Sequence, residues 1–211
     1  GARLTLPPRS SAATGERFVA EHAAWLAAQL QRFASDAGSG LIRGQTTQLP
    51  LRGRSVPLRW EAGRTTRLQA TGDADALVFS LPVRARDAAI QRAARDFYEA
   101  QGRTDVGRWL PRYLASLPRA PRQVRFKVMS SQWGSLAPDG SVTLDLSLVL
   151  ARPSAFEYVL VHELCHLIHH DHSRAFWREV EARFPAWRDE RRYFNAEGRR
   201  LKATLRALIR A

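Results

Sequence analysis

Residues 156–166 read Phe-Glu-Tyr-Val-Leu-Val-His-Glu-Leu-Cys-His, an apolar run that ends in a His-Glu-x-x-His motif. The apolar part predicts a buried helix. His162 and His166 are four residues apart, slightly more than one helical turn, so both imidazoles leave the same face of this helix. They start about 6 Å apart along the helix axis, which is close enough for both to bind one tetrahedral Zn²⁺ ion.

Glu163 follows the first histidine and would lie beside such a metal without having to bind it. A carboxylate there can take a proton from a metal-activated water and return it to a leaving amine. The same motif also occurs by chance in helices that bind no metal. However, Leu164, Cys165, Leu167 and Ile168 are apolar or soft where a solvent-facing chance match would carry charge. The motif therefore predicts zinc-dependent hydrolysis.

A catalytic zinc ion needs three protein ligands and an open fourth position. His170 continues the face of His162, but in a straight helix the two would lie about 12 Å apart along the axis. Ligands that far apart cannot both reach one ion at about 2.0–2.1 Å. His169 points away from that face, which makes it a poor candidate as well.

The third ligand is expected at His172. The preceding Asp171 and the following Ser173 favour a turn and a new helix N-terminus, and a chain that turns there can fold His172 back toward the metal. In the alternative interpretation, His169, His170 and His172 only form an exposed polar turn.

Two further blocks of sequence accompany the motif. Residues 131–135 read Ser-Gln-Trp-Gly-Ser and precede the strand-like run 142–148, while residues 172–177 read His-Ser-Arg-Ala-Phe-Trp. Together with the motif, these blocks resemble the YgjP-like family of bacterial zinc metallopeptidases, relatives of the SprT-like and WLM proteases among the gluzincin-type enzymes. The resemblance is strong over residues 120–190. It implies a catalytic base at Glu163 and zinc ligands at His162, His166 and His172.

Three positions differ from the pattern of that family. Gln132 stands where the family usually has Arg or Lys, Leu136 replaces a common Cys, and Asp145 replaces a common Asn. None of them is an implied metal ligand, so the differences concern contacts with the substrate rather than the class of chemistry.

The composition is that of a soluble globular protein. The chain has 211 residues, of which 45% are hydrophobic and 25% charged, enough for one well-buried core or two small ones. No apolar run approaches the length of a membrane span, and the first residues lack the pattern of a signal peptide. The single cysteine, Cys165, allows no internal disulfide and is expected to pack rather than bind zinc. We therefore expect a cytoplasmic protein.

The formal net charge is +13, nearly all of it from arginine. Such an excess favours polyanions such as nucleic acids or anionic lipid surfaces. The arginines are scattered, with local density at residues 191–192 and 199–200, and no basic-aromatic platform or named DNA-binding motif accompanies them. A solvated surface is the simpler interpretation. Nucleic acid is kept as an alternative partner, and no membrane partner is expected.

The order of the patterns predicts an α+β fold with two parts. Residues 84–211 are expected to form a zincin-like metallopeptidase domain, and residues 1–83 an N-terminal helix and a small antiparallel sheet. Helical spacing of apolar residues predicts the first helix over residues 14–35. Short strands over residues 41–82, separated by glycines and aspartates, predict the sheet.

In the second part, apolar stripes predict one helix around residues 90–97 and a second around residues 106–117. Alternating apolar residues at 124–128 and 142–148, with turn residues at 137–140, predict a β-hairpin that precedes the zinc helix. An amphipathic helix is expected from Ser173 to Pro185, and an Arg-rich helix from about Trp187 onward.

This hairpin could offer the exposed strand edge to which an extended substrate adds in His-Glu-x-x-His proteases. Trp133 would then lie near the cleft or, alternatively, anchor the hairpin by packing. Gly134 would allow a close approach of the backbones. By residue type, Tyr158, Arg174 and Tyr193 are candidates for stabilising the oxyanion.

The sequence therefore predicts a zinc metallopeptidase, in particular an endopeptidase, with one catalytic Zn²⁺ ion and a peptide or protein substrate. One alternative is a DNA-associated SprT-like protease or a non-catalytic, zinc-stabilised nucleic-acid-binding protein. Another is a structural zinc site without turnover, which a fourth protein ligand such as His169 or Asp171 would close.

Overall fold

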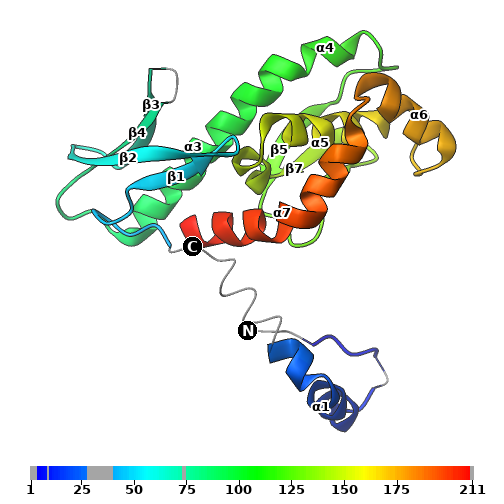
Figure 1. The fold of residues 1–211 in the computed structure, drawn as a ribbon, viewed down its shortest axis with the longest axis horizontal. Coiled ribbons are helices and arrows are strands. Elements are labelled where there is room, and N and C mark those ends of the chain that lie inside the picture. The colour runs from blue at the N-terminus through cyan, green and yellow to red at the C-terminus, as the bar shows by residue number, and fades with distance from the viewer. Residues whose placement is uncertain (1–3, 9, 28–39, 73–74, 210–211) are drawn as a thin grey trace.

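The computed structural model describes residues 4–8, 10–27, 40–72 and 75–209 and has an α+β fold with two mixed sheets (Figure 1). The helices and strands, in chain order, are α1 (Ala12–Glu21), β1 (Gln48–Leu51), β2 (Arg54–Ala62), β3 (Arg67–Thr71), β4 (Ala76–Leu81), α3 (Asp87–Trp109), α4 (Pro111–Leu114), β5 (Gln123–Lys127), β6 (Gly134–Leu136), β7 (Ser141–Asp145), the 3₁₀ helix η1 (Leu146–Leu150), α5 (Pro153–Cys165), α6 (Arg174–Arg183) and α7 (Trp187–Leu208).

The first helix begins close to where the sequence predicts it. Ser11 caps α1 by accepting a hydrogen bond from the backbone N–H of Thr14. Residues 23–27 are helical again, and residues 28–35 of the predicted helix lie outside the described residues. Gly15 is the only buried residue of α1, so this helix contributes little to the core.

The first sheet has the strand order β1-β2-β4-β3 and is mixed rather than antiparallel. β1 pairs with β2 and β3 pairs with β4 in antiparallel fashion, but β2 and β4 run parallel, with Leu58 opposite Leu77. The prediction of an antiparallel sheet was wrong because β2 and β3, although consecutive in the chain, are not neighbours in the sheet. β3 instead occupies the far edge, and β4 returns between them.

The two helices predicted over residues 90–117 are largely one helix. α3 runs without interruption for 23 residues, and only the four-residue α4 follows it. Gly102 does not end the helix. A Cβ atom at Gly102 would lie 2.7 Å from the ring of Phe126, so this glycine allows β5 to pack closely against α3. The helix ends just before Pro111, which begins α4 at a position where proline is tolerated.

The predicted hairpin exists, but with a different first strand. β7 pairs with β6 through the turn at residues 137–140, in which Gly140 has a φ of 83°, whereas β5 runs parallel to β7 on its other side. The chain between β5 and β7 is long enough to place β6 at the sheet edge. Residues 146–150 form η1 and not a strand, because the Asp145 side chain accepts the backbone N–H of Ser147 and turns the chain.

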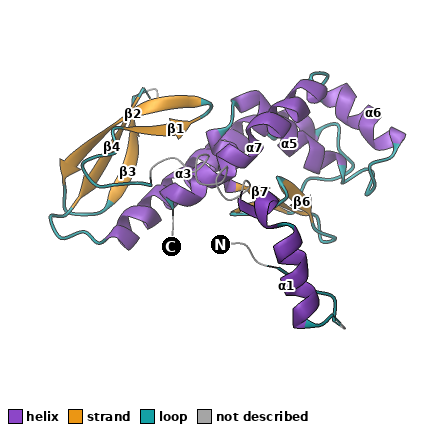
Figure 2. Ribbon diagram, turned by 60° about the horizontal axis from the view of Figure 1, so that its bottom comes forward, coloured by secondary structure: helices purple, strands orange, loops and turns teal. Residues whose placement is uncertain are grey.

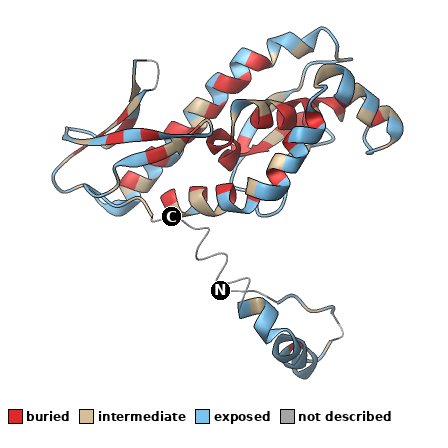
Figure 3. Cartoon of the chain, viewed as in Figure 1, coloured by how far each residue is buried: buried red, intermediate tan, exposed pale blue. Residues whose placement is uncertain are grey.

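A single core extends from β1 to α7 (Figure 3). In Figures 1 and 2 the four-stranded sheet and α5 lie on opposite sides of α3, and α7 packs along α5 and η1. The helices α6 and α7 begin and end close to the predicted positions. The predicted boundary between residues 83 and 84 falls between β4 and α3 and stays a prediction. Within the described ranges, no helix is sufficiently long and apolar to cross a membrane.

Candidate metal centre

Three histidine side chains converge at the C-terminal end of α5. His162 lies on the helix, His166 is its C-cap residue, and His172 lies in the loop before α6. Each offers one nitrogen, and these atoms all lie within 4.8 Å of one another. The Nε2 atoms of His162 and His172 are 3.1 Å apart. The cluster could therefore hold a metal ion, and its members are the three histidines expected from the sequence. Their roles as ligands stay predictions.

The helix ends at the second histidine because its backbone tightens there. The N–H groups of His166, Leu167 and Ile168 donate to the carbonyl groups three residues earlier, at 3.2, 3.0 and 3.0 Å. This 3₁₀-type turn ends α5 at Cys165. The chain consequently leaves the helix axis after His166. His170 is therefore not on the same helix as His162, and the spacing expected for a straight helix does not apply to this pair.

The return of His172 depends on the start of α6, as the sequence predicts. Ser173 caps α6 by accepting the backbone N–H of Phe176 at 3.4 Å. Asp171 in turn accepts the backbone N–H of Ser173 at 3.2 Å. These two hydrogen bonds hold the turn that places His172 beside His162. His170 lines the same cleft without belonging to the cluster of three.

Neighbouring groups orient the imidazole rings. The Nδ1–H of His166 donates to the carbonyl of His169 at 3.0 Å, which leaves Nε2 as the free ligand atom. The ring of Phe176 is fully buried and contacts all three histidines, with centroid distances of 4.5 Å to His166 and 4.9 Å to each of the others. One aromatic side chain of α6 thus fixes rings that come from α5 and from the loop.

Burial also keeps the imidazoles of His162 and His166 neutral. Burial, followed by the neighbouring His166 and His172 and by Arg191, lowers the pKa of His162 to about 3. Burial likewise lowers the pKa of His166. Only a neutral imidazole can bind a metal. Convergent, neutral nitrogen atoms therefore fit a divalent ion that accepts imidazole ligands, zinc among them.

Glu163 lies next to this cluster and is 5% exposed. Burial raises the pKa of its carboxyl group to about 8, which places it in the range where a carboxylate can exchange protons at neutral pH. Its side chain faces the backbone of Gly134: a Cβ atom on that glycine would lie 2.6 Å from Oε1 of Glu163. The carboxyl group therefore sits between the histidines and β6.

The histidines and Glu163 line a cleft of about 740 Å³. Its wall on one side is the stretch from Gln132 to Leu136, which contains β6. β6 is an edge strand, paired only with β7 within the described sheet. The cleft thus combines a possible metal position, a carboxyl group and an unpaired strand edge. The other lining residues are Tyr158, Val159, His170, Trp177, Arg191, Phe194 and Asn195.

The sequence matches the family described as "YgjP-like, metallopeptidase domain" over residues 1–197. The chain belongs to this YgjP-like family. Among solved structures it is similar to the metallopeptidase zymogen abylysin of Pyrococcus abyssi, with 24% identity, 48% of this chain and 93% of that chain covered, and a TM-score of 0.35. A search of curated proteins found no match.

In this YgjP-like chain, Trp133 both packs and lines the cleft, so the two interpretations of this residue hold together. Its ring lies 4.4 Å from that of Phe194 and covers Gly198, where a Cβ atom would come within 2.6 Å of the indole. The ammonium group of Lys202 lies 4.3 Å from the Trp133 centroid. Helix α7 therefore supports the residue that precedes β6.

Lys202 also holds the loop before Trp133. Its Nζ donates to the carbonyls of Met129 and Gln132 at 3.2 and 2.8 Å, and it forms an ion pair of 3.1 Å with Asp145. Asp145, only 1% exposed, also accepts the backbone N–H of Met129. The sequence analysis missed Lys202. A signal was available, because it is one of two lysines in an otherwise arginine-rich chain and lies beside the apolar stripe of α7.

The three residues considered for stabilising the oxyanion lie in different parts of the structure. Tyr158 lines the cleft, with its ring centroid 6.0 Å from that of His162. Tyr193 lies outside the cleft lining, where its ring packs under Arg152, and Arg174 lines a neighbouring groove. Arg191 and Asn195, both from α7, line the cleft and were missed, because nothing in the local pattern relates α7 to the histidines.

Proposed function

We propose that this YgjP-like chain is a zinc-dependent endopeptidase. In this proposal His162, His166 and His172 bind one zinc ion, and Glu163 is the general base. The observation that supports it is the convergence of three imidazole nitrogens within 4.8 Å, at a cleft that also contains a buried carboxyl group. A zinc ion bound there would polarise the peptide carbonyl and increase the acidity of water.

Glu163 would move the proton. Its carboxylate takes a proton from the attacking water and returns it to the amine of the leaving peptide. The raised pKa of about 8 is that of the buried carboxyl group without a metal ion beside it. A bound cation would favour the ionised form, which a base requires. Of the three residues considered for stabilising the oxyanion, Tyr158 is the one that lines the cleft, so it is our candidate for a hydrogen bond to the oxyanion.

The free edge of β6 would position the substrate. An extended peptide can add to this edge through main-chain hydrogen bonds, which brings its carbonyl groups alongside the histidines. Main-chain pairing does not require a chain end, and this supports cleavage within a peptide. We also propose that residues 84–211 form the metallopeptidase domain and residues 1–83 an N-terminal part, since the residues that line the cleft all belong to the former.

A closed structural zinc site is the less favoured alternative. Neither His169 nor Asp171 belongs to the group of three, and Asp171 accepts the backbone N–H of Ser173. Among the residues that the structure describes, no fourth histidine, cysteine or carboxylate joins the group of three. An open position toward the cleft is what a catalytic zinc requires.

The test is hydrolysis of an unfolded protein or an internally quenched peptide by the zinc-loaded chain. We expect cleavage at internal bonds, its loss on chelation, and its recovery on addition of one equivalent of zinc. Binding of zinc without hydrolysis of any substrate from a broad peptide library would contradict the proposal and favour a structural site.

A further inference from the structure

A shallow groove adjoins the cleft on the side of α6 and α7. The residues that line it are Arg174, Trp177, Arg178, Glu181, Trp187 and Arg188. Trp177 lines both the groove and the cleft, and its ring centroid lies 5.7 Å from that of His162 and 5.9 Å from that of His172. The groove therefore begins one side chain away from the cluster of histidines.

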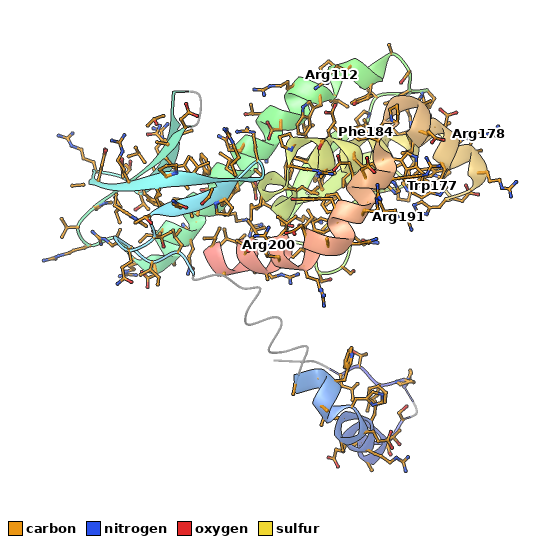
Figure 4. All side chains as sticks on the ribbon, in the orientation of Figure 1. Arg112, Trp177, Arg178, Phe184, Arg191 and Arg200 are labelled. Atoms are coloured by element: carbon orange, nitrogen blue, oxygen red, sulfur yellow. The ribbon has the colours of Figure 1, made fainter. Side chains whose placement is uncertain are left out.

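Two of the three arginines that line this groove have no anionic partner among the described residues. Glu181 forms an ion pair with Arg188, but within the described part of the chain Arg174, Arg178 and the cleft residue Arg191 form no ion pair. Some exposed arginines elsewhere do form ion pairs, as Arg112 does with Glu157 and Arg200 with Glu197. Figure 4 shows Trp177, Arg178 and Arg191 together at one end of the molecule, away from Arg112 and Arg200.

Two stacked tryptophans lie against the guanidinium groups of Arg188 and Arg191. The rings of Trp177 and Trp187 lie 4.3 Å apart at an interplanar angle of 22°. The guanidinium group of Arg188 lies 4.5 Å from the Trp187 centroid, and that of Arg191 lies 5.6 Å from the Trp177 centroid. The sequence analysis found no basic-aromatic platform, and the structure corrects it: helices α6 and α7 assemble one from residues that are not adjacent in the chain.

The arrangement favours carboxylates over nucleobases. Sequence-tolerant binding of single-stranded nucleic acid uses aromatic rings with a free face on which bases stack. Here Trp187 is 7% exposed, and the two indoles cover one another and carry guanidinium groups. Arginine N–H groups, by contrast, need no free ring to bind a carboxylate, and an arginine held by an aromatic ring loses less freedom when it does so.

We propose that Arg191, with Arg174 and Arg178, forms a subsite for aspartate and glutamate side chains of the peptide substrate. This inference rests on the proposed peptidase function and names its substrate class. An extended peptide advances about 3.3 Å per residue. The ring centroid of Trp177 lies 5.7 Å from that of His162, and the guanidinium group of Arg191 lies 5.6 Å from the Trp177 centroid. The acidic residue would therefore lie within about three residues of the scissile bond.

The first experiment compares otherwise identical quenched peptides that carry Glu or Gln at each of the three positions on either side of the cleaved bond. With the zinc-loaded chain, we expect kcat/KM for the Glu peptide to exceed that for the Gln peptide by about fivefold to tenfold at the best position, as two or three partly exposed ion pairs would produce. The ratio should fall toward one in about 0.5 M salt, which screens such charges.

Variants locate the effect. Arg191→Gln and the double substitution Arg174→Gln/Arg178→Gln should each reduce the Glu-to-Gln ratio to about twofold or less. The matched control is Arg54→Gln, because Arg54 is exposed at the start of β2 and outside both cavities. It should leave the ratio unchanged. An equal decrease in Arg54→Gln would show a general charge effect and overturn the subsite.

A binding measurement separates this inference from the proposed function. Fluorescence anisotropy of a labelled Glu peptide with the Glu163→Gln chain requires no turnover, and the same arginine dependence is expected there. Equal cleavage of Glu and Gln peptides at every position would overturn the subsite while the peptidase stands. Arginine-dependent binding without cleavage of any peptide would support the subsite and contradict the peptidase. A single-stranded oligonucleotide that binds more tightly than the Glu peptide, through Arg174 and Arg178, would identify a nucleic-acid surface and overturn the subsite.

Discussion

Gly134 lies directly against the carboxyl group of Glu163, so closely that a Cβ atom on the glycine would stand 2.6 Å from Oε1. Real Cβ atoms do not approach oxygen atoms to this distance, so any side chain at this position must displace Glu163 or β6. The strand edge and the proposed base thus share a space that only glycine leaves open.

For this reason Gly134→Ala should damage hydrolysis more than folding. A displacement of the base by a fraction of an ångström to 1 Å is expected to lower kcat by about 10-fold to 100-fold, while zinc content stays near one equivalent. Gly107→Ala in α3, outside the cleft, serves as the matched control and should retain activity, because a Cβ atom there would meet nothing within 4 Å. Full activity in Gly134→Ala would show that the base does not need this close contact.

The third histidine can be tested by metal content. His172→Ala should sharply reduce bound zinc, because two remaining imidazoles cannot hold the ion in the same way. His170→Ala is the matched control from the same loop, and it should leave zinc nearly intact. Elemental analysis after dialysis decides between them, and the opposite result would reverse the assignment of the ligand.

Glu163→Gln should separate binding from chemistry. The amide keeps the shape of the side chain but cannot accept the proton, so kcat should fall by about 10²-fold to 10⁴-fold, with zinc binding retained. Parallel measurements of zinc content and kcat provide the test. Loss of zinc together with activity would point to a ligand role for Glu163.

The metal-free chain should lose stability as the pH rises above neutrality. The folded-state pKa of Glu163 is raised by burial to about 8, above its ordinary value of 4.5, so its contribution to stability is full below pH 4.5 and is lost as the pH rises through 8. The folded-state pKa of His162 is lowered to about 3, so its imidazole is neutral in the folded state, but in the unfolded state it is still partly protonated at pH 6.5 and is neutral only above about pH 7.5. This titration offsets a small part of the Glu163 effect, and thermal unfolding should show Tm decreasing by about 3–5 °C from pH 6.5 to 9.

The control for this effect is the metal-free Glu163→Gln chain, in which no carboxyl group titrates at this position. Its Tm should stay flatter from pH 6.5 to 9. Parallel Tm curves for the two chains would show that Glu163 is ionised in the folded, metal-free protein at neutral pH.

The ion pair between Lys202 and Asp145 should be needed for the loop that carries Trp133. Lys202→Met would leave Asp145 buried without its cation, at an expected cost of about 3–5 kcal/mol in the free energy of unfolding. Adding Asp145→Asn should recover part of this loss, since it removes the unpaired charge. Urea unfolding of both single variants and the double variant measures the coupling. Strictly additive effects would mean that the two residues act independently.

The centre of the site was predictable because its signals are local. His162 and His166 share a helix face through their spacing alone, and Ser173 begins α6 by a capping hydrogen bond to a residue three positions away. The turn that returns His172 likewise follows from Asp171 and Ser173, neighbours in the chain. Helices α6 and α7 also follow from apolar periodicity.

The strand partners were decided by contacts between distant segments. The sequence predicts a hairpin of residues 124–128 with 142–148, and only the three-dimensional path of the chain places β5 parallel to β7 on one side and β6 antiparallel on the other. The role of Gly102 also depends on a contact between distant segments. In the structure it makes room for the ring of Phe126 within an unbroken helix.

The sequence by itself therefore determined the His-Glu-x-x-His helix and the turn after it, since their hydrogen bonds and spacings involve residues within about one or two helical turns. Tertiary structure alone decided which residues surround that helix. Lys202 binds the carbonyl of Met129, 73 positions earlier in the chain, and α7 brings Arg191 to the cleft beside Trp177. No local pattern encodes such contacts, because they arise when packed helices bury their apolar faces together.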